Sequence, residues 1–267
     1  MTTNDSTPQA VLKVRDIPAN TLPAMVHPGW AITFPWLVQG TTTRGGLPVP
    51  FDLGLYSSGS SESVVLDHWS HLLMATSITQ AVHAPQIHGA EVRVHRRVGQ
   101  RDAGDDVGLH LVEPCDGHLT DESGVLLSVA VADCVPVFVV DVRTRAIAVL
   151  HAGWRGASAG VLENGLSGMV ASFGSAVGDL HLHLGPSICG DCYEVGGEVF
   201  AAMDQPVPDG NAPIDLRVLL AARAAARGVR EDRISISEHC TRCTASELFS
   251  HRGGDAHRQV AYLGIRG

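Results

Sequence analysis

The stretch that decides the fold is Val131-Ala-Asp-Cys-Val-Pro-Val-Phe-Val-Val-Asp141-Val-Arg-Thr-Arg-Ala-Ile-Ala-Val-Leu-His151-Ala-Gly-Trp-Arg-Gly156. Two apolar, β-branched runs flank the polar segment 141–145, and this pattern predicts a strand, a turn and a second strand. With the turn centred between Val142 and Arg143, antiparallel pairing places Cys134 opposite His151, with their Cβ atoms about 4.5–5.5 Å apart. A thiolate and an imidazole at that separation can share a metal ion or act as nucleophile and base. A change of one residue in the register would separate them.

The pair also has a structural interpretation, in which Cys134 is a buried free thiol and His151 is a strand-end histidine with ordinary hydrogen bonds. The glycines in Gly153-Trp154-Arg155-Gly156 leave room for a ligand beside the pair. A helix expected at about 157–173 follows them. The backbone N–H groups at its glycine-rich start point toward the loop that holds Arg155, an arrangement that suits an anion.

The composition is that of an ordinary soluble globular protein. Of the 267 residues, 45% are hydrophobic, which is enough to bury a large core. The net charge of −9 and the absence of Lys/Arg blocks argue against nucleic-acid or membrane binding, so small-molecule partners are expected. The N-terminal residues lack the pattern of a secretory signal. Six cysteines then indicate reduced thiols and metal ligands in a cytoplasmic protein.

Hydrophobic periodicity predicts an α/β (α+β) fold with a mixed β-sheet, since buried β-branched strands alternate with amphipathic helices. Residues 1–25 are expected to form a flexible N-terminal tail. Helices are predicted at about 62–76, at 157–173, and from the capping Asp215 to Arg227. Besides the central hairpin, strands are predicted within 30–43, 84–94, 181–184, 234–237 and 259–265. His181 and His183 share one face of their strand, which is interpreted as a solvated edge.

Three further positions are candidates for function. Arg44 lies beside Gly45-Gly46 after a predicted strand, where its guanidinium can bind an anion, unless it is simply an exposed loop residue. His88 precedes a glycine at a break in the strand pattern. Asp116 precedes Gly117, so its simplest role is that of a turn or capping residue. Position alone does not select His88, because three other histidines compete with it: His83, His95 and His110.

Two Cys-x-x-Cys pairs, at 189/192 and 240/243, suggest a tetrahedral zinc site made of four thiolates. However, 47 residues lie between the pairs, compared with about 15–20 in the usual zinc ribbon. Reduced, partly buried thiols are therefore the favoured interpretation. The structural metal site remains the alternative.

From about Trp30 to Gly267 the chain resembles the bacterial laccase-domain family, also called multicopper polyphenol oxidase-like or peptidoglycan editing factor proteins. The human purine nucleoside enzyme FAMIN is a relative of that family. The resemblance rests on motifs that occur in a fixed order: Thr42-Thr-Arg-Gly-Gly46, Gln86-Ile-His-Gly89, Asp116-Gly-His-Leu-Thr-Asp121, Ala132-Asp-Cys-Val-Pro-Val137, His151-Ala-Gly-Trp-Arg-Gly156, Gly185-Pro-Ser-Ile188 with Cys192-Tyr-Glu-Val195, and Cys240-Thr241 with Phe249-Ser-His-Arg252.

The resemblance implies a single layered catalytic domain at 26–267, with helices packed outside a central sheet. It also implies a metal site made of His88, Cys134 and His151. Two histidines and a thiolate suit zinc, and three protein ligands leave a fourth position for water. Copper is the alternative metal. Asp116 or Asp133 would orient a ligand histidine or carry a proton.

For function, the resemblance implies phosphorolysis of adenosine, inosine or methylthioadenosine, together with deamination of adenosine. The partners would be a nucleoside and phosphate, and either a monomer or a homodimer is consistent with the sequence. The phosphate-binding candidates are Arg44, Arg155, Arg252 and Arg258. The sequence departs from the family at Ser250-His251-Arg252-Gly253, where Ser-Tyr-Arg-Arg is common, and at His257-Arg258, where Gly-Arg is usual. These departures call phosphate binding, and with it phosphorolysis, into question.

Three other functions are consistent with the same residues. The first is a cytoplasmic amidohydrolase that edits peptidoglycan precursors, with Cys134 as nucleophile and His151 as base, or with water on the zinc as attacking group. The second is a copper-dependent polyphenol oxidase. The third is a non-enzymatic protein in which the site only stabilises the fold.

Overall fold

Two seven-stranded mixed sheets form the centre of the computed structural model, which describes residues 11–46, 48–98, 107–244 and 247–267. In spatial order, the first sheet contains β1 (Leu12–Val14), β15 (Ile234–Ser237), β12 (His181–Leu184), β10 (Val135–Val140), β11 (Ile147–Ala152), β8 (Gly117–Thr120) and β6 (Val92–Val94). The second contains β2 (Ile17–Pro18), β3 (Ala24–Val26), β4 (Leu37–Thr42), β16 (Gln259–Ile265), β9 (Val125–Val131), β5 (Gln80–His83) and β7 (Leu109–Leu111). A small ladder joins β13 (Glu194–Val195) to β14 (Ala212–Pro213).

Six α-helices and three short 3-10 helices occur in the described part of the chain. The α-helices are α1 (Pro28–Thr33), α2 (Glu62–Thr76), α3 (Trp154–Ala159), α4 (Val161–Phe173), α5 (Gly197–Ala202) and α6 (Leu216–Ala226). Short 3-10 helices are η1 (Val177–Asp179), η2 (Gly190–Cys192) and η3 (Glu231–Arg233). None of the described helices is long and apolar enough to cross a membrane.

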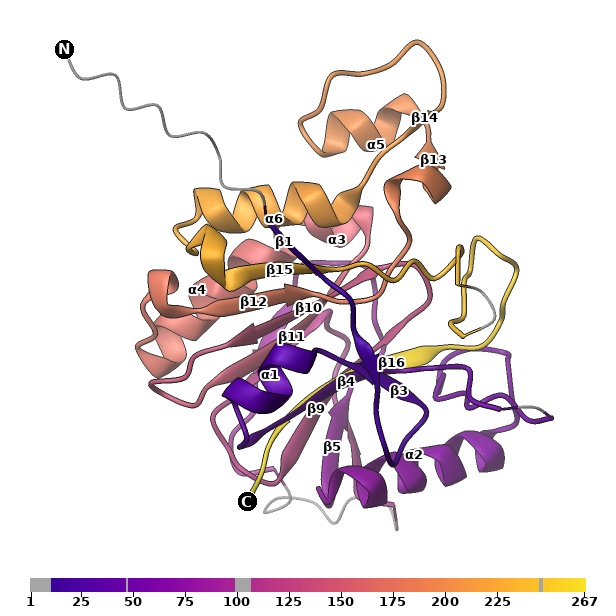
Figure 1. Cartoon of the computed structure of the whole chain (residues 1–267), viewed down its shortest axis with the longest axis vertical. Helices are drawn as coiled ribbons and strands as arrows, with labels where there is room; N and C mark the ends of the chain where they lie inside the picture. The colour runs from indigo at the N-terminus through magenta and orange to yellow at the C-terminus, as the bar shows by residue number, and fades with distance from the viewer. Residues whose placement is uncertain (1–10, 47, 99–106, 245–246) are drawn as a thin grey trace.

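The two sheets face each other across an apolar core, and helices cover their outer faces (Figure 1). Phe138 and Val149 of the first sheet share one buried cluster with Leu127 and Leu263 of the second. Helices α3, α4 and α6 pack on the outer face of the first sheet, and α2 packs on that of the second. The α/β class with a mixed-sheet core and outer helices is therefore confirmed, although the core consists of two sheets and not one central sheet.

Helix α2 matches the prediction for 62–76 and anchors the second sheet. Val65, Trp69 and Leu72 recur at helical spacing and are buried, so the helix has one apolar face. The indole N–H of Trp69 donates a hydrogen bond to the Leu53 carbonyl at 3.1 Å. This contact fixes the loop that precedes the helix, and that loop forms one wall of the site described below.

Regular structure begins closer to the N-terminus than the predicted tail of residues 1–25 allows. Residues 1–10 lie outside the described residues, but β1, β2 and β3 pair with the two sheets from Leu12 onward. The tail boundary at residue 25 is therefore wrong. The predicted strand region 30–43 is also divided, because residues 28–33 form α1 and only Leu37–Thr42 forms a strand.

Two other elements are interrupted at special backbone positions. The helix expected at 157–173 begins earlier, at Trp154, and is broken into α3 and α4 by Gly160, whose φ is +92°. The region 84–94 forms a strand only at Val92–Val94, and His88, with a φ of +57°, lies in a bend before that strand. The interpretation of His181 and His183 as a solvated edge is wrong, since β12 lies inside the first sheet and His183 is buried.

The central hairpin forms from β10 and β11, but its register differs from the predicted one. Pro136 is paired with His151, and Val135 with Ala152. The turn is therefore centred one residue later than predicted, and Cys134 lies just before the first strand opposite the end of the second. Because partners shift by two residues, Cys134 and His151 stay on the same face of the hairpin, where diagonal neighbours remain within reach.

Candidate metal centre and pocket

His88, Cys134 and His151 come together at the carboxyl end of β11. One potential ligand atom from each residue lies within 4.8 Å of the other two. His151 is buried, Cys134 is partly buried and His88 is exposed, so the cluster lies at the floor of an open site. The structure thus brings together the three side chains that the family resemblance implies as ligands.

The Asp116 carboxylate accepts hydrogen bonds from both histidines of the cluster. This buried group accepts a hydrogen bond from His151 Nδ1 at 2.8 Å. It also accepts backbone N–H bonds from His88 at 3.0 Å and Gly89 at 2.7 Å. These bonds stabilise the left-handed turn at His88, and they leave His151 Nε2 free for a ligand. A carboxylate that fixes the ring of a metal-binding histidine is the usual supporting arrangement in such sites.

Cys134 and His151 shift each other's pKa values in the directions that favour a thiolate beside an imidazolium. Burial raises the pKa of the Cys134 thiol, but the charge of His151 and hydrogen bonds from His151 and His88 lower that pKa to about 6. Burial likewise lowers the pKa of His151, whereas the Cys134 charge and the hydrogen bond to Asp116 raise it to about 9. Cys134 is therefore poised as a thiolate, the form in which cysteine binds metals and attacks electrophiles.

Gly153 leaves the space that the cluster needs. A Cβ atom at this position would lie 2.9 Å from Cys134 Sγ and 3.2 Å from His88 Cδ2. Both contacts are shorter than ordinary van der Waals distances, so any side chain would push the ligand atoms apart. Gly153 is one of the glycines whose missing side chains were predicted to leave room for a ligand beside Cys134 and His151.

We expect Gly153→Ala to weaken metal binding by at least about tenfold, because ligands must be held within a few tenths of an ångström. Isothermal titration of metal-free protein with zinc measures the effect. Gly46→Ala is the matched control, since a Cβ there meets no atom within 4 Å. Equal zinc affinities for the two variants would contradict the proposed packing.

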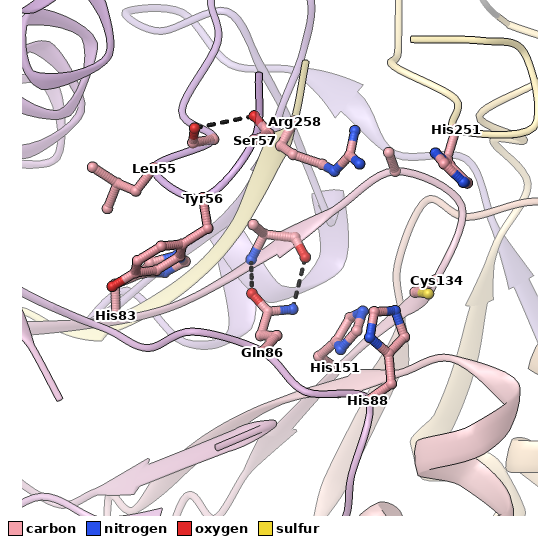
Figure 2. A pocket seen from close by; sticks show the side chains of 13 residues that line it. Leu55, Tyr56, Ser57, His83, Gln86, His88, Cys134, His151, His251 and Arg258 are labelled. Atoms are coloured by element: carbon pink, nitrogen blue, oxygen red, sulfur yellow. Dashed lines mark hydrogen bonds between the residues drawn. The ribbon is translucent and has the colours of Figure 1, made fainter. Parts of the chain in front are cut away.

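A cavity of about 320 Å³ extends from this cluster. In Figure 2, Cys134 and His151 lie at one side of the cavity and Tyr56 with His83 at the other, with Gln86 between them. The full lining consists of Gly54, Leu55, Tyr56, Ser57, His83, Gln86, His88, Ala130, Ala132, Cys134, His151, His251 and Arg258. Its volume falls within the range of about 300–1,000 Å³ that is typical of small-molecule sites.

His83 lies at the side of the cavity away from the His88–Cys134–His151 cluster. Its ring is fully buried, and burial lowers its pKa to about 4, so it is neutral. Ser128 Oγ donates its only hydrogen to the Val82 carbonyl at 2.7 Å, so His83 Nδ1 must donate to Ser128 Oγ at 3.0 Å. His83 Nε2 therefore carries the free lone pair, and it has no partner among the described residues.

The other predicted site residues are divided between the cavity and its surroundings. Arg258 lines the cavity, whereas Arg44 pairs with Asp255 at 2.7 Å, away from the lining. Arg252 and Arg155 stand over the rings of Tyr193 and Trp154 respectively, outside the lining residues. Asp133, next to Cys134, accepts hydrogen bonds from Thr241 Oγ1 at 2.5 Å and from the Arg252 backbone at 2.7 Å.

Several lining residues were not predicted as site residues from the sequence. Tyr56 and Ser57 lie in the loop before α2, where no site residue was predicted, and His83 was one of several competing histidines. Gln86 is held by two hydrogen bonds to Ala130, so its amide fixes the wall of the cavity. His251 is the residue that replaces the usual tyrosine of the family motif. Among these residues, Gln86 belongs to one of the family motifs and His251 to a departure from another, so both positions carried a signal in the sequence.

The fold and the His88–Cys134–His151 cluster define a layered α/β protein with a candidate metal centre at the edge of its sheets. Residues 37–266 match the family described as multi-copper polyphenol oxidoreductase laccase. The chain therefore belongs to that family.

Its relatives include proteins with assigned activities. Purine nucleoside phosphorylase YlmD of Geobacillus stearothermophilus is 30% identical, and the match covers 89% of this chain and 95% of YlmD. The crystal structure of YlmD superposes with a TM-score of 0.84 over 94% of this chain and all of that chain, at 27% identity. Adenosine deaminase RL5, from an unknown prokaryotic organism, is 36% identical over 58% of this chain and 63% of RL5.

Proposed function

We propose that this protein is a zinc-dependent purine nucleoside phosphorylase that acts on adenosine, inosine and methylthioadenosine and also deaminates adenosine. One observation carries the proposal: a single cavity joins the His88–Cys134–His151 cluster to a cationic side chain, Arg258, and to a neutral acceptor, His83. The activities named for YlmD and RL5 support the same substrate class. The free state of all six cysteines fits a reducing compartment, and we infer a cytoplasmic location.

The residues of the cluster fit a zinc ion. Two imidazoles and one thiolate are ligands that zinc prefers, and a set of three protein ligands is typical of catalytic zinc sites. The hydrogen bond from His151 Nδ1 to Asp116 leaves Nε2 for the metal, and the absence of a side chain at Gly153 provides the space. When bound, zinc would supply a Lewis acid that polarises a substrate oxygen or lowers the pKa of water.

The remaining lining residues suit the parts of a nucleoside. The Tyr56 ring lies parallel to His83, with ring centroids 6.0 Å apart, and offers a flat apolar wall for a purine. His83 Nε2 would accept a hydrogen bond from an amine or ring N–H of the base once the exposed Tyr56 side chain moves off its ring. Arg258 and His251 lie beside a second, more open hollow that shares Tyr56 and Ser57 with the cavity, so a phosphate can approach from there.

The test is product analysis of adenosine incubated with zinc-loaded protein, with and without phosphate. With phosphate we expect adenine and ribose 1-phosphate, and without phosphate we expect inosine. Chromatography of the reaction separates these products. If neither appears at high enzyme concentration, the proposal is wrong.

Arg258→Gln separates the two reactions. We expect it to raise the KM for phosphate by about 10- to 100-fold, because a charge-assisted contact to an anion is worth about 1.5–3 kcal/mol. Adenosine deamination needs no phosphate and should change much less. The exposed Arg227→Gln serves as control. An equal loss of both reactions would show that Arg258 supports the site as a whole, since its guanidinium also donates to the His257 carbonyl at 2.8 Å.

A second candidate function is favoured by a specific arrangement. Cys134, His151 and Asp116 stand in the order nucleophile, base and orienting carboxylate, which is also the layout of a cysteine hydrolase. Such an enzyme would hydrolyse an amide, as expected of an editor of peptidoglycan precursors. Its activity would persist after zinc is removed with a chelator, whereas the proposed nucleoside chemistry would stop.

A further inference from the structure

A second cluster of cysteines lies apart from the catalytic candidate. The two Cys-x-x-Cys pairs, distant in sequence, meet in space, and the four sulfur atoms lie within 4.8 Å of one another. Cys243 Sγ is 3.8 Å from Cys189 Sγ and 3.4 Å from Cys192 Sγ. None of the six cysteines of the chain is in a disulfide.

The sheet topology explains how the pairs meet. Strands β12 and β15 are parallel neighbours in the first sheet, so the loops that follow them leave from the same edge. The first loop carries Cys189 and Cys192, and the second carries Cys240 and Cys243. A parallel bridge between Ser187 and Cys240 keeps the two loops in register. The long separation in sequence therefore does not argue against a shared site.

The spacing of the sulfur atoms fits a metal ion. Four thiolates about 2.3 Å from a tetrahedral zinc ion lie about 3.8 Å from one another. The distances from Cys243 Sγ to Cys189 Sγ and to Cys192 Sγ are at or just below that value. They are well above the length of a disulfide bond, which is about 2.05 Å. The cluster has the size of an open tetrathiolate cage.

Backbone hydrogen bonds support the same assignment. The N–H groups of Cys189 and Cys243 both donate to Cys240 Sγ, at 3.2 and 3.4 Å. Hydrogen bonds of this kind stabilise a thiolate and orient its lone pairs. Cys240 is buried, and a buried sulfur that accepts two backbone donors is already prepared to bind a metal ion.

We propose that Cys189, Cys192, Cys240 and Cys243 bind one zinc ion as a structural tetrathiolate site, separate from the His88–Cys134–His151 centre. The ion joins the loop after β12 to the loop after β15. Those loops hold Asp133 beside the catalytic candidate, since Thr241 donates to its carboxylate and the Ile188 N–H donates to its carbonyl at 3.0 Å. The second site thus fixes one wall of the first.

Zinc content of purified, dialysed protein tests the proposal. Wild-type protein should hold about two zinc ions per chain, and Cys134→Ser and the double variant Cys192→Ser/Cys243→Ser about one each. Cys115→Ala, which changes a buried cysteine outside both clusters, should keep about two. The double variant should also unfold at a temperature about 5–10 °C lower. A wild-type and double variant with equal zinc content would overturn the proposal.

X-ray absorption of the zinc-loaded Cys134→Ser protein keeps the test valid if the double variant fails to fold. We expect a zinc environment of four sulfur atoms at about 2.3 Å. Nitrogen or oxygen ligands there, no bound zinc, or disulfides among the four cysteines in mass spectra of unreduced protein would each overturn the assignment. Because this variant lacks the catalytic thiolate, the result does not depend on whether the protein acts on nucleosides.

Discussion

Cys134→Ser is expected to lower kcat/KM for adenosine by on the order of 10³-fold, in deamination and in phosphorolysis. Serine binds zinc far more weakly than a thiolate does, and a Lewis acid in an active site is worth several kcal/mol, with a factor of ten for each 1.4 kcal/mol. The side chains are nearly isosteric, so the fold should persist. Steady-state rates in zinc-supplemented buffer, with circular dichroism as a check on folding, measure the effect.

Cys115→Ala is the matched control for this substitution. Cys115 is fully buried, and burial raises the pKa of its thiol to about 11, so it is an inert thiol. Its loss should cost some stability and leave the turnover of adenosine nearly unchanged. Full activity of Cys134→Ser would remove this cysteine from the chemistry and would contradict the account of the site.

Asp116→Asn is expected to weaken zinc binding by about 10- to 100-fold, the usual effect of losing a group that orients a metal ligand. The carboxylate accepts bonds from the His88 and Gly89 backbones and from His151 Nδ1. In an asparagine, an NH2 group replaces one of the two accepting oxygens and would face one of these N–H donors. That buried donor would lose its acceptor, which costs about 1–3 kcal/mol. The turn at His88, with its φ of +57°, would then lose its support.

Zinc affinity from competition with a coloured chelator, combined with kcat at saturating zinc, checks this prediction. If Asp116 acts by positioning the ligands, excess zinc should restore most of the activity. Asp121→Asn, at an exposed position in the same segment, is the control and should behave as wild type. Loss of kcat that zinc does not restore would indicate a direct role of Asp116 in proton transfer.

The hairpin pattern predicted that Cys134 and His151 lie close together, and they do so although the predicted register was wrong. The β-branched runs define the two strands, but the polar turn of five residues does not specify which peptide bond lies at its centre. The predicted register was off by one turn position. The period of two along a strand preserved the face on which both side chains lie, so the two residues still meet.

Other parts of the site depend on contacts that no local pattern contains. His88 reaches the cluster from a left-handed turn held by Asp116, a residue 28 positions away in sequence. Only the family resemblance selected it. Arg44 shows the opposite case. Its glycine neighbours suggested an anion site, but Asp255, on a distant loop, forms an ion pair with it.

The two Cys-x-x-Cys pairs show how topology changes a judgement made from spacing. Zinc ribbons place both pairs in one short segment, and by that measure the pairs are too far apart. Parallel neighbouring strands give a different route, because their carboxyl ends meet at one edge of the sheet. Strand adjacency, which the sequence did not specify, was the missing information.

The most direct test of the central claim is an anomalous difference map at the zinc absorption edge, from crystals of zinc-loaded protein soaked with adenosine. We predict a peak between Cys134 Sγ, His151 Nε2 and a ring nitrogen of His88, with the nucleoside in the cavity between this peak and His83. The absence of a peak at these three side chains, in protein shown to contain zinc, would contradict the account.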